Sequence, residues 1–397
     1  MKKAKLLRIV LSLALVFTLV FAGSGSTFAA ETTSGSNVID AVNANSTSVT
    51  PDLAYLQYSS SASAKQEIKT PKAGTIAVRF TATAPTYAYL YDAKGNQIYG
   101  YSTSVPASSS DTDYKYAYFP VTAAGTYTLE LKAATYGGSA EALIDAFYYP
   151  TSGTLTKGKT YYGSSPDGKV SYYKVTATST GYFTVDFPAG YNDPASYQVK
   201  LMSSSKKAIF KKGYEYVNSS KSYKTRIGVT KGTYYLAVKT TDPYYGINVK
   251  FTSVKENSGS TKGKAKSLSK GNTKRGIITA SQSSTSGDWY KFTIKKAQKV
   301  KIEVSTLTSQ GGGNGGLKVS FYQGKNSYSS FTENFNYYND SDTITLYTVG
   351  SSKLAAGTYY MKVQKYNDGN GYYKIKWQQN EVHKSTHIKP NVKSFGT

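Results

Sequence analysis

The residues that most often perform catalysis are scarce in this chain. It has no cysteine and only two histidines, His383 and His387, both in the polar C-terminal tail. A Ser/His/Asp triad needs a rigid, oriented imidazole, which a polar tail does not provide. The i, i+4 spacing of the two histidines also occurs in helical metal pairs, but no glutamate directly follows the first histidine and no helical pattern is present here. We therefore predict that the chain is not an enzyme.

Paired carboxylates are the remaining route to hydrolysis. Glycosidases place two carboxyl groups about 5–9 Å apart. From residue 151 onward the chain has 13 acidic residues, most of them in turn contexts such as Asp167-Gly168 and Asp368-Gly369. Turn formation explains these residues. Because a carboxylate pair has no sequence signature, a glycosidase-like secreted hydrolase is kept as the alternative function.

Two short polar clusters contain the oxygen ligands that calcium prefers. One is Asp111-Thr112-Asp113, and the other contains Asp340 and Asp342. Neither has the spacing of an EF-hand loop, with its central glycine and terminal glutamate. We expect these to be ordinary polar residues of loops, and we therefore predict no cofactor. Calcium is the one metal that their oxygen atoms would suit.

The glycine run at residues 311–316 does not have the sequence of a phosphate-binding loop. It lacks the Lys-Ser/Thr ending, and no helix is predicted after it. We expect a flexible, exposed loop between two strands.

One strand pattern occurs three times, each time after a Gly-Thr-Tyr start. Its alternating residues share a face and are Tyr127/Leu129/Leu131, Tyr234/Leu236/Val238 and Tyr359/Met361/Val363. Alternation of this kind predicts a half-buried strand. A turn and a second strand follow each copy, at 142–148, 246–251 and 372–377. We predict a hairpin at the end of each of three units.

Further strands precede each hairpin, and no helical periodicity of useful length follows the N-terminal segment. The additional strands are predicted at 75–81, 88–92, 171–176, 182–187, 198–202, 289–294, 300–305 and 317–322. Short strands separated by turn signals indicate an all-β chain of sandwiches or barrels. Gly/Ser/Thr/Lys-rich segments at 150–158 and 255–269 have the composition of linkers. We predict modules at 31–150, 151–255 and 256–379, and a polar tail at 380–397.

The N-terminus has the composition and order of a signal peptide. Lys2, Lys3, Lys5 and Arg8 precede an apolar run at 9–22, and small residues follow as far as Ala30. Cleavage is expected after Ala29 or Ala30. The alternative is an uncleaved anchor, but the run is shorter than the ~20 residues that span a bilayer. We predict a secreted, extracellular protein that associates peripherally with the cell wall.

The third unit resembles the bacterial pre-peptidase C-terminal domain. The similarity rests on Gly287-Asp288-Trp289-Tyr290-Lys291-Phe292 and on the strand Gly357–Val363, and it is strongest over 256–379. It implies three tandem jelly-roll-like antiparallel β-sandwich modules. Related collagen-binding sandwiches can hold calcium at the start of the module, where this chain has Glu256 and Asn257. These domains usually accompany a catalytic domain, but the three units use almost the whole chain.

Positive charge is concentrated in the last two units. Residues 31–150 contain 7 Lys and Arg against 10 Asp and Glu, a net charge of −3. The net charge is +11 for residues 151–255 and +13 for residues 256–397. Such a field attracts anionic polymers and weakens as salt screens it. A solvated lysine-rich surface that keeps sheet edges apart explains the same composition.

The outer faces of the repeated hairpin strands are the predicted binding surfaces. Tyr235 and Lys239 alternate out of register with the buried set of the second unit, and Tyr360 and Lys362 do so in the third. Aromatic and basic residues there could bind acidic glycans, or could form ordinary cross-strand pairs.

We therefore predict a binding or matrix protein for an anionic wall polymer or acidic polysaccharide. A structural or inhibitory partner of another exported protein is a further alternative. Nucleic acid is not expected as a ligand, because no recognised nucleic-acid motif is present.

Overall fold

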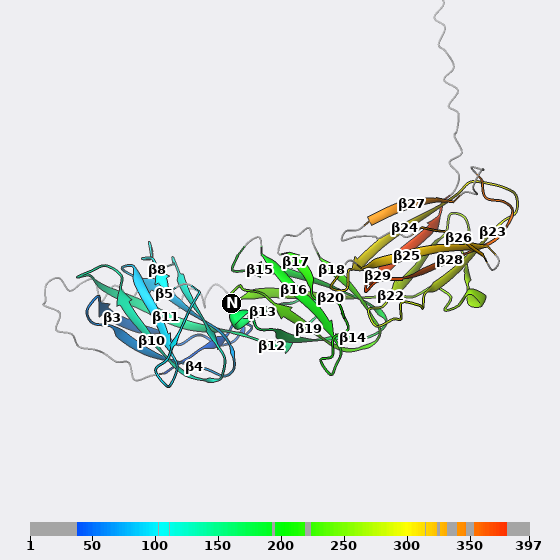
Figure 1. The fold of residues 1–397 in the computed structure, drawn as a ribbon. Helices are drawn as coiled ribbons and strands as arrows, with labels where there is room; N and C mark the ends of the chain where they lie inside the picture. The colour runs from blue at the N-terminus through cyan, green and yellow to red at the C-terminus, as the bar shows by residue number, and fades with distance from the viewer. Residues whose placement is uncertain are drawn as a thin grey trace, which may run out of the picture.

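The computed structural model describes residues 38–378 except 102, 111, 193–194, 219–223, 314, 324–325, 332–339 and 347–352. The described chain forms six sheets in three successive pairs (Figure 1). No described helix is long and apolar enough to cross a membrane. The histidines of the tail lie outside the described residues.

Module 1 is the first pair of sheets. The first sheet has the order β1-β4-β10-β6-β7, with β8 also paired to β6, and the second has the order β2-β11-β5-β9, with β3 paired to β11. The strands are β1 (Ile39–Asp40), β2 (Val42–Asn43), β3 (Ala54–Ser59), β4 (Ala64–Thr70), β5 (Gly74–Ala82), β6 (Thr86–Tyr91), β7 (Gln97–Ile98), β8 (Ser104–Val105), β9 (Lys115–Val121), β10 (Gly125–Ala133) and β11 (Ser139–Pro150).

Module 2 has sheets of order β12-β14-β19-β16-β17 and β13-β20-β15-β18. A short 3-10 helix, η1 (Pro166–Gly168), lies between β13 and β14. The strands are β12 (Ser152–Thr154), β13 (Thr160–Gly163), β14 (Ser171–Ala177), β15 (Gly181–Gly190), β16 (Ser196–Met202), β17 (Glu215–Asn218), β18 (Thr225–Val229), β19 (Gly232–Lys239) and β20 (Tyr245–Ser253).

Module 3 repeats the strand order of module 2, with sheets β21-β23-β28-β25-β26 and β22-β29-β24-β27. A second 3-10 helix, η2 (Lys262–Lys264), precedes it. The strands are β21 (Lys266–Ser267), β22 (Thr273–Ile278), β23 (Asp288–Ile294), β24 (Val300–Ser309), β25 (Gly316–Gln323), β26 (Asn326–Phe331), β27 (Asp340–Leu346), β28 (Gly357–Tyr366) and β29 (Asn370–Trp377).

The fold is therefore all-β, with three tandem jelly-roll-like sandwiches, as predicted. Its ladders are antiparallel except for short parallel edge pairs such as β12 with β14 and β21 with β23. Each module encloses its own hydrophobic cluster. The alternating sets on β10, β19 and β28 are all buried, which confirms the predicted inner faces. The predicted hairpins are wrong, because β11, β20 and β29 each cross to the other sheet of the sandwich and pair there with β5, β15 and β24.

Many tyrosines are core residues of the modules. In module 2 the hydroxyls of Tyr173 and Tyr245 lie 3.0 Å apart, and both rings are fully buried. Tyr290 and Tyr373 form the corresponding pair in module 3, at 2.9 Å. A buried hydroxyl needs a partner, and here each tyrosine supplies one to the other.

The segments with linker composition are hydrogen-bonded into the modules. β12 pairs with β14, and the amide of Leu155 donates to Lys174 at 2.9 Å. Further along, Gly259 and Trp289 exchange two backbone hydrogen bonds of 3.0 and 2.8 Å. Composition alone misled here, because Gly, Ser and Thr fit an edge strand as well as a linker.

Neighbouring modules touch through tyrosines in equivalent places. Tyr244, just before β20, stacks on Tyr149 at 4.8 Å and on Tyr118 at 5.4 Å, both in module 1. Tyr372 of β29 stacks on Tyr182 of module 2 at 5.7 Å. Modules 2 and 3 thus place an equivalent ring against the module before them, and in module 2 Tyr191 also contacts Tyr118, at 5.3 Å.

The glycine run also lies at the junction between modules 2 and 3, so the prediction of an exposed loop was wrong. Gly311 and Gly315 are buried. At Gly312, with φ +83°, an added Cβ would lie 2.4 Å from the carbonyl oxygen of Gly213 in module 2. Glycine is needed there for a close approach of two backbones.

Candidate functional site

The first predicted face is on the outer side of β19. Tyr235 is half-buried and lies opposite Lys174 on β14 and Met202 on β16. Lys239 is exposed at the end of the strand, opposite Gln198. The structure thus places both residues on the solvent side of the sheet, though only Tyr235 lies among aromatic neighbours.

A lysine that the sequence did not single out covers this face. The ammonium of Lys206 lies 4.9 Å from the ring centroid of Tyr172 on β14 and 5.1 Å from that of Tyr235. A cation over an aromatic face is attracted by about 0.5–1 kcal/mol at an exposed site. Two rings together therefore hold one ammonium group above the sheet.

The backbone that presents Lys206 is in a left-handed conformation, with φ 57°. Lys206 stands in the turn after β16, where Ser203 and Lys207 are joined by a 2.8 Å backbone hydrogen bond. The turn after β6 in module 1 has the same bonding pattern, between Asp92 and Asn96, and there the left-handed position is Gly95. A residue other than glycine in this left-handed conformation lowers the stability of the fold by about 1–2 kcal/mol. Glycine would be unstrained at this position, yet module 2 has a lysine there.

Module 3 has a matching arrangement on the outer side of β28. Tyr360 is half-buried and lies opposite Lys291 on β23 and Tyr322 on β25. The ammonium of Lys262, in η2, lies 4.9 Å from the centroid of Tyr360 and 5.4 Å from that of Tyr322. Again one lysine covers two rings, although a different loop supplies it.

Lys362 belongs to the same face. Its ammonium lies 5.6 Å from the centroid of Trp289 and donates a 2.8 Å hydrogen bond to the carbonyl of Thr285. Partial burial, with a smaller contribution from the charge of Lys318, lowers the pKa of Lys362. Trp289 in turn packs against Tyr322 at 5.3 Å.

We call these two surfaces the lysine–aromatic faces: Lys206, Tyr172 and Tyr235 in module 2, and Lys262, Lys362, Trp289, Tyr322 and Tyr360 in module 3. Sequence reasoning found Tyr235, Tyr360 and Lys362 through strand alternation. It missed Lys206 and Lys262 because both stand in loops. An aromatic residue at the second position of β14 and β23 was the available signal for Tyr172 and Trp289.

The corresponding face of module 1 is chemically different. The position of Tyr235 is occupied by Thr128, which lies opposite Glu67 and Tyr91. Glu130, two residues further on, is 3.6 Å from the ammonium of Lys132. Glu67 therefore stands in the place of Lys174 and Lys291, and Glu130 in the place of Lys362.

The residues considered for calcium do not form one site. Glu256 and Asn257 precede module 3, where the amide of Asn257 donates to Arg275 on β22. Asp340 and Asp342 belong to β27, at the opposite edge of that four-stranded sheet, and their side chains lie outside the described part. The edges of such a sheet are about 14 Å apart at normal strand spacing. Asp111 is also outside the described residues, and Asp113 accepts a 2.6 Å bond from Lys115.

In the structure, the buried carboxyl group of Asp288 lies near Glu256. Its carboxylate accepts a 2.5 Å hydrogen bond from the hydroxyl of Tyr373. Burial, and then the nearby charge of Glu256, raise the pKa of Asp288 well above its usual range. Ser258 donates to Glu256 at 2.9 Å.

This donor set is small for calcium, which takes 6–8 oxygen ligands. Two carboxylates and one hydroxyl are of the right chemical type. Among the described residues, however, no group of three or more Asp, Glu, His or Cys could hold a metal ion.

A cleft of about 490 Å³ between modules 1 and 2 brings two carboxylates to one surface, Asp92 and Asp167. Asp92 accepts hydrogen bonds from the amides of Lys94 and Asn96 at 2.9 and 2.8 Å. Bonds from the side chain and the amide of Asn96 are the main cause of its lowered pKa. A general acid needs a raised pKa, so Asp92 does not have the environment of the general acid of a glycosidase.

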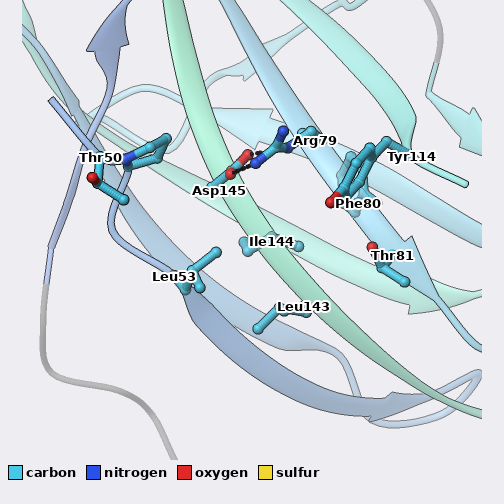
Figure 2. A pocket seen from close by; sticks show the side chains of 10 residues that line it. Thr50, Leu53, Arg79, Phe80, Thr81, Tyr114, Leu143, Ile144 and Asp145 are labelled. Atoms are coloured by element: carbon cyan, nitrogen blue, oxygen red, sulfur yellow. Dashed lines mark hydrogen bonds and ion pairs between the residues drawn. The ribbon is translucent and has the colours of Figure 1, made fainter. Parts of the chain in front are cut away.

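A smaller pocket of about 80 Å³ lies on module 1 (Figure 2). Arg79 and Asp145 form an ion pair at its rim, where β5 and β11 run side by side. The guanidinium also lies 4.4 Å from the ring centroid of Tyr114. Ligand pockets usually measure about 300–1,000 Å³, so this hollow is too small for a sugar unit.

Comparisons with known proteins concern the fold alone. No protein-family model and no curated protein matches the chain. Among solved structures, it is similar to the pre-peptidase C-terminal domain of collagenase from Bacillus anthracis, at 19% identity over 32% of this chain and 99% of that one, with a TM-score of 0.22. It is also similar to the CUB1-EGF-CUB2 domains of rat MASP-1, at 5% identity over 56% and 99% of the two chains, with a TM-score of 0.17.

A third similar structure is the M60 catalytic domain with the CBM51-1 and CBM51-2 domains from Clostridium perfringens ZmpB. There the identity is 8% over 81% of this chain and 34% of that one, with a TM-score of 0.16.

Proposed function

We propose that this chain is a secreted, non-enzymatic binding protein that associates with anionic cell-wall polymers or acidic polysaccharide through the lysine–aromatic faces of modules 2 and 3. The proposal includes cleavage of the N-terminal signal segment and a pre-peptidase C-terminal type of module. The observation that carries it is the repeated placement of one lysine ammonium over two aromatic rings. Module 1, with Glu67 and Glu130 on the same face, is not part of the binding surface.

Holding a lysine in place favours anion binding. Immobilising a flexible side chain on binding costs about 0.5–1.5 kcal/mol, and a lysine already fixed over two rings avoids part of that cost. An ammonium group held in this way can donate charge-assisted hydrogen bonds to a phosphate or carboxylate oxygen. The rings beside it provide apolar surface for a sugar or polyol backbone.

Strain at Lys206 supports the same conclusion. A left-handed lysine costs stability that the two cation–π contacts largely offset, so its position brings the fold no evident net gain. Residues kept in such conformations cluster at functional sites.

Binding to purified cell wall tests the proposal. The full mature chain should sediment with wall fragments, lose most of this binding when wall teichoic acid is removed, and release steeply as salt is raised. Retention that is unchanged between low and high salt would contradict the proposal. Release of reducing sugar from acidic glycans would favour the hydrolase instead.

No cofactor is part of this proposal. Glu256 and Asp288 are the described carboxylates that would hold calcium, and Ca²⁺ would supply charge compensation there. A melting temperature that is the same with millimolar Ca²⁺ and with EDTA would support cofactor-free folding. A calcium-dependent rise that disappears in Glu256→Gln would overturn it.

A further inference from the structure

A second feature with the chemistry of a binding site lies between modules 2 and 3, away from both lysine–aromatic faces. It is a cleft of about 310 Å³, which reaches the lower end of the size range of ligand pockets. One side comes from the end of module 2 and the other from β22, β24 and β29 of module 3. Its charged and aromatic lining residues are Tyr182, Lys255, Arg275, Tyr372 and Lys374.

The aromatic wall of the cleft spans the junction. Tyr182 of β15 and Tyr372 of β29 stack with ring centroids 5.7 Å apart and planes at 30°. Arg275 lies close enough to act on the Tyr372 hydroxyl: burial raises the pKa of Tyr372, and the arginine charge opposes that rise. The rings and the guanidinium therefore face one space.

None of the three cations is paired with an acid in the part of the chain that the structure describes. Arg275 and Lys374 are direct register partners on β22 and β29, and like charges placed opposite each other destabilise a sheet. Lys255 adds a third positive charge from the end of module 2. Among the described residues, no ion pair involves any of these three side chains, all of which are exposed.

We infer that this cleft binds one anionic unit of a polyol or sugar polymer, with the phosphodiester or carboxylate between Arg275, Lys374 and Lys255 and the carbon skeleton against Tyr182 and Tyr372. An anion converts the repulsion between Arg275 and Lys374 into two charge-assisted bonds, and the guanidinium fork matches both kinds of oxyanion. The inference rests on the proposed function for the source of the polymer. It adds a separate site, formed only where two modules meet.

The test compares two charge-matched triple variants of the full mature chain. The cleft variant is Lys255→Gln, Arg275→Gln, Lys374→Gln. The control is Lys295→Gln, Lys296→Gln, Lys299→Gln, which removes the same charge from exposed residues of module 3 outside the cleft lining. Affinity is measured by fluorescence anisotropy with labelled oligo(glycerol phosphate) and, separately, labelled oligogalacturonate.

The cleft variant should bind at least about tenfold more weakly than the wild type, and the control no more than about threefold more weakly. The melting temperature of the cleft variant should stay the same or rise, because a like-charge pair is removed. The probe with the larger loss identifies phosphodiester or carboxylate as the preferred group. Equal losses in the two variants would overturn the cleft site while leaving the proposed function intact. A wild type that binds neither probe would overturn both.

Discussion

The ammonium of Lys206 lies 5.1 Å from the ring centroid of Tyr235, and the lysine reaches it from a left-handed backbone with φ 57°. The same turn in module 1 has Gly95, with φ 81°. The turn therefore accepts glycine at this position, and Lys206 can be removed without a new backbone conformation.

Lys206→Gly should weaken binding to anionic polymer without lowering the melting temperature of the chain. The loss of two cation–π contacts costs about 1–2 kcal/mol and relief of the left-handed strain returns a similar amount. We expect an affinity loss of about three- to tenfold, which corresponds to about 0.6–1.4 kcal/mol.

Lys207→Gly is the matched control, because it removes the same charge from the same turn. Lys207 has no positive φ and lies over no ring in the described structure. Equal losses of affinity in the two variants would show that only net charge matters at this turn.

Tyr235→Ser and Tyr360→Ser, made separately, should reduce affinity while lowering the stability of their modules only slightly. Each residue is half-buried on an outer face, where a cross-strand partner contributes about 0.2–1 kcal/mol and a cation–π contact a similar amount. Chemical denaturation and polymer binding measure the two effects.

Tyr234→Ser and Tyr359→Ser are the neighbouring controls, because their rings are buried in the cores of modules 2 and 3. Truncating a core aromatic residue costs about 3–5 kcal/mol, so these variants should lose stability first. If Tyr235→Ser proved as destabilising as Tyr234→Ser, its ring would be a structural element of the sheet.

The fold could be predicted because each repeated strand alternates with period two. Tyr234, Leu236 and Val238 had to share one face, and the structure buries all three. The hydroxyl pair of Tyr173 and Tyr245 could not be predicted, because strand periodicity says which face a ring occupies and not which ring it meets. The same is true of the candidate site. Strand alternation predicts the outer face of Tyr235, whereas the position of the Lys206 ammonium depends on the conformation of its turn.

Limited proteolysis should cut the exposed turn of module 1 before either segment of linker composition. Tyr136, between β10 and β11, is fully exposed, and it is followed by Gly137 with φ 71°. The segments 152–154 and 255–260 carry backbone hydrogen bonds to the strands β14, β22 and β23, whereas the turn of module 1 bonds to turn residues, from Gly137 to the Ser60 hydroxyl and from Gly138 to the Thr135 carbonyl. Proteases need an unpaired, accessible backbone.

Mass spectrometry of early fragments checks this order within the described residues. First cuts at 150–158 or 255–270, giving module-sized fragments, would mean that these segments open in solution and act as linkers after all.

The stability of module 3 should fall as pH rises, because of Asp288. Its folded-state pKa is raised, chiefly by burial and then by Glu256, so the folded state holds a proton that the unfolded state releases near pH 4. This contribution is fully present below the unfolded pKa and is lost as pH rises through the raised folded pKa.

Asp288→Asn mimics the protonated carboxyl at every pH. In EDTA, its melting temperature should match that of the wild type near pH 4, exceed it increasingly as pH rises toward the raised folded pKa of Asp288, and keep a constant lead above that pKa. A wild-type advantage that grows with pH would mean that Asp288 is needed as a charged group and that its pKa is lowered in the folded state.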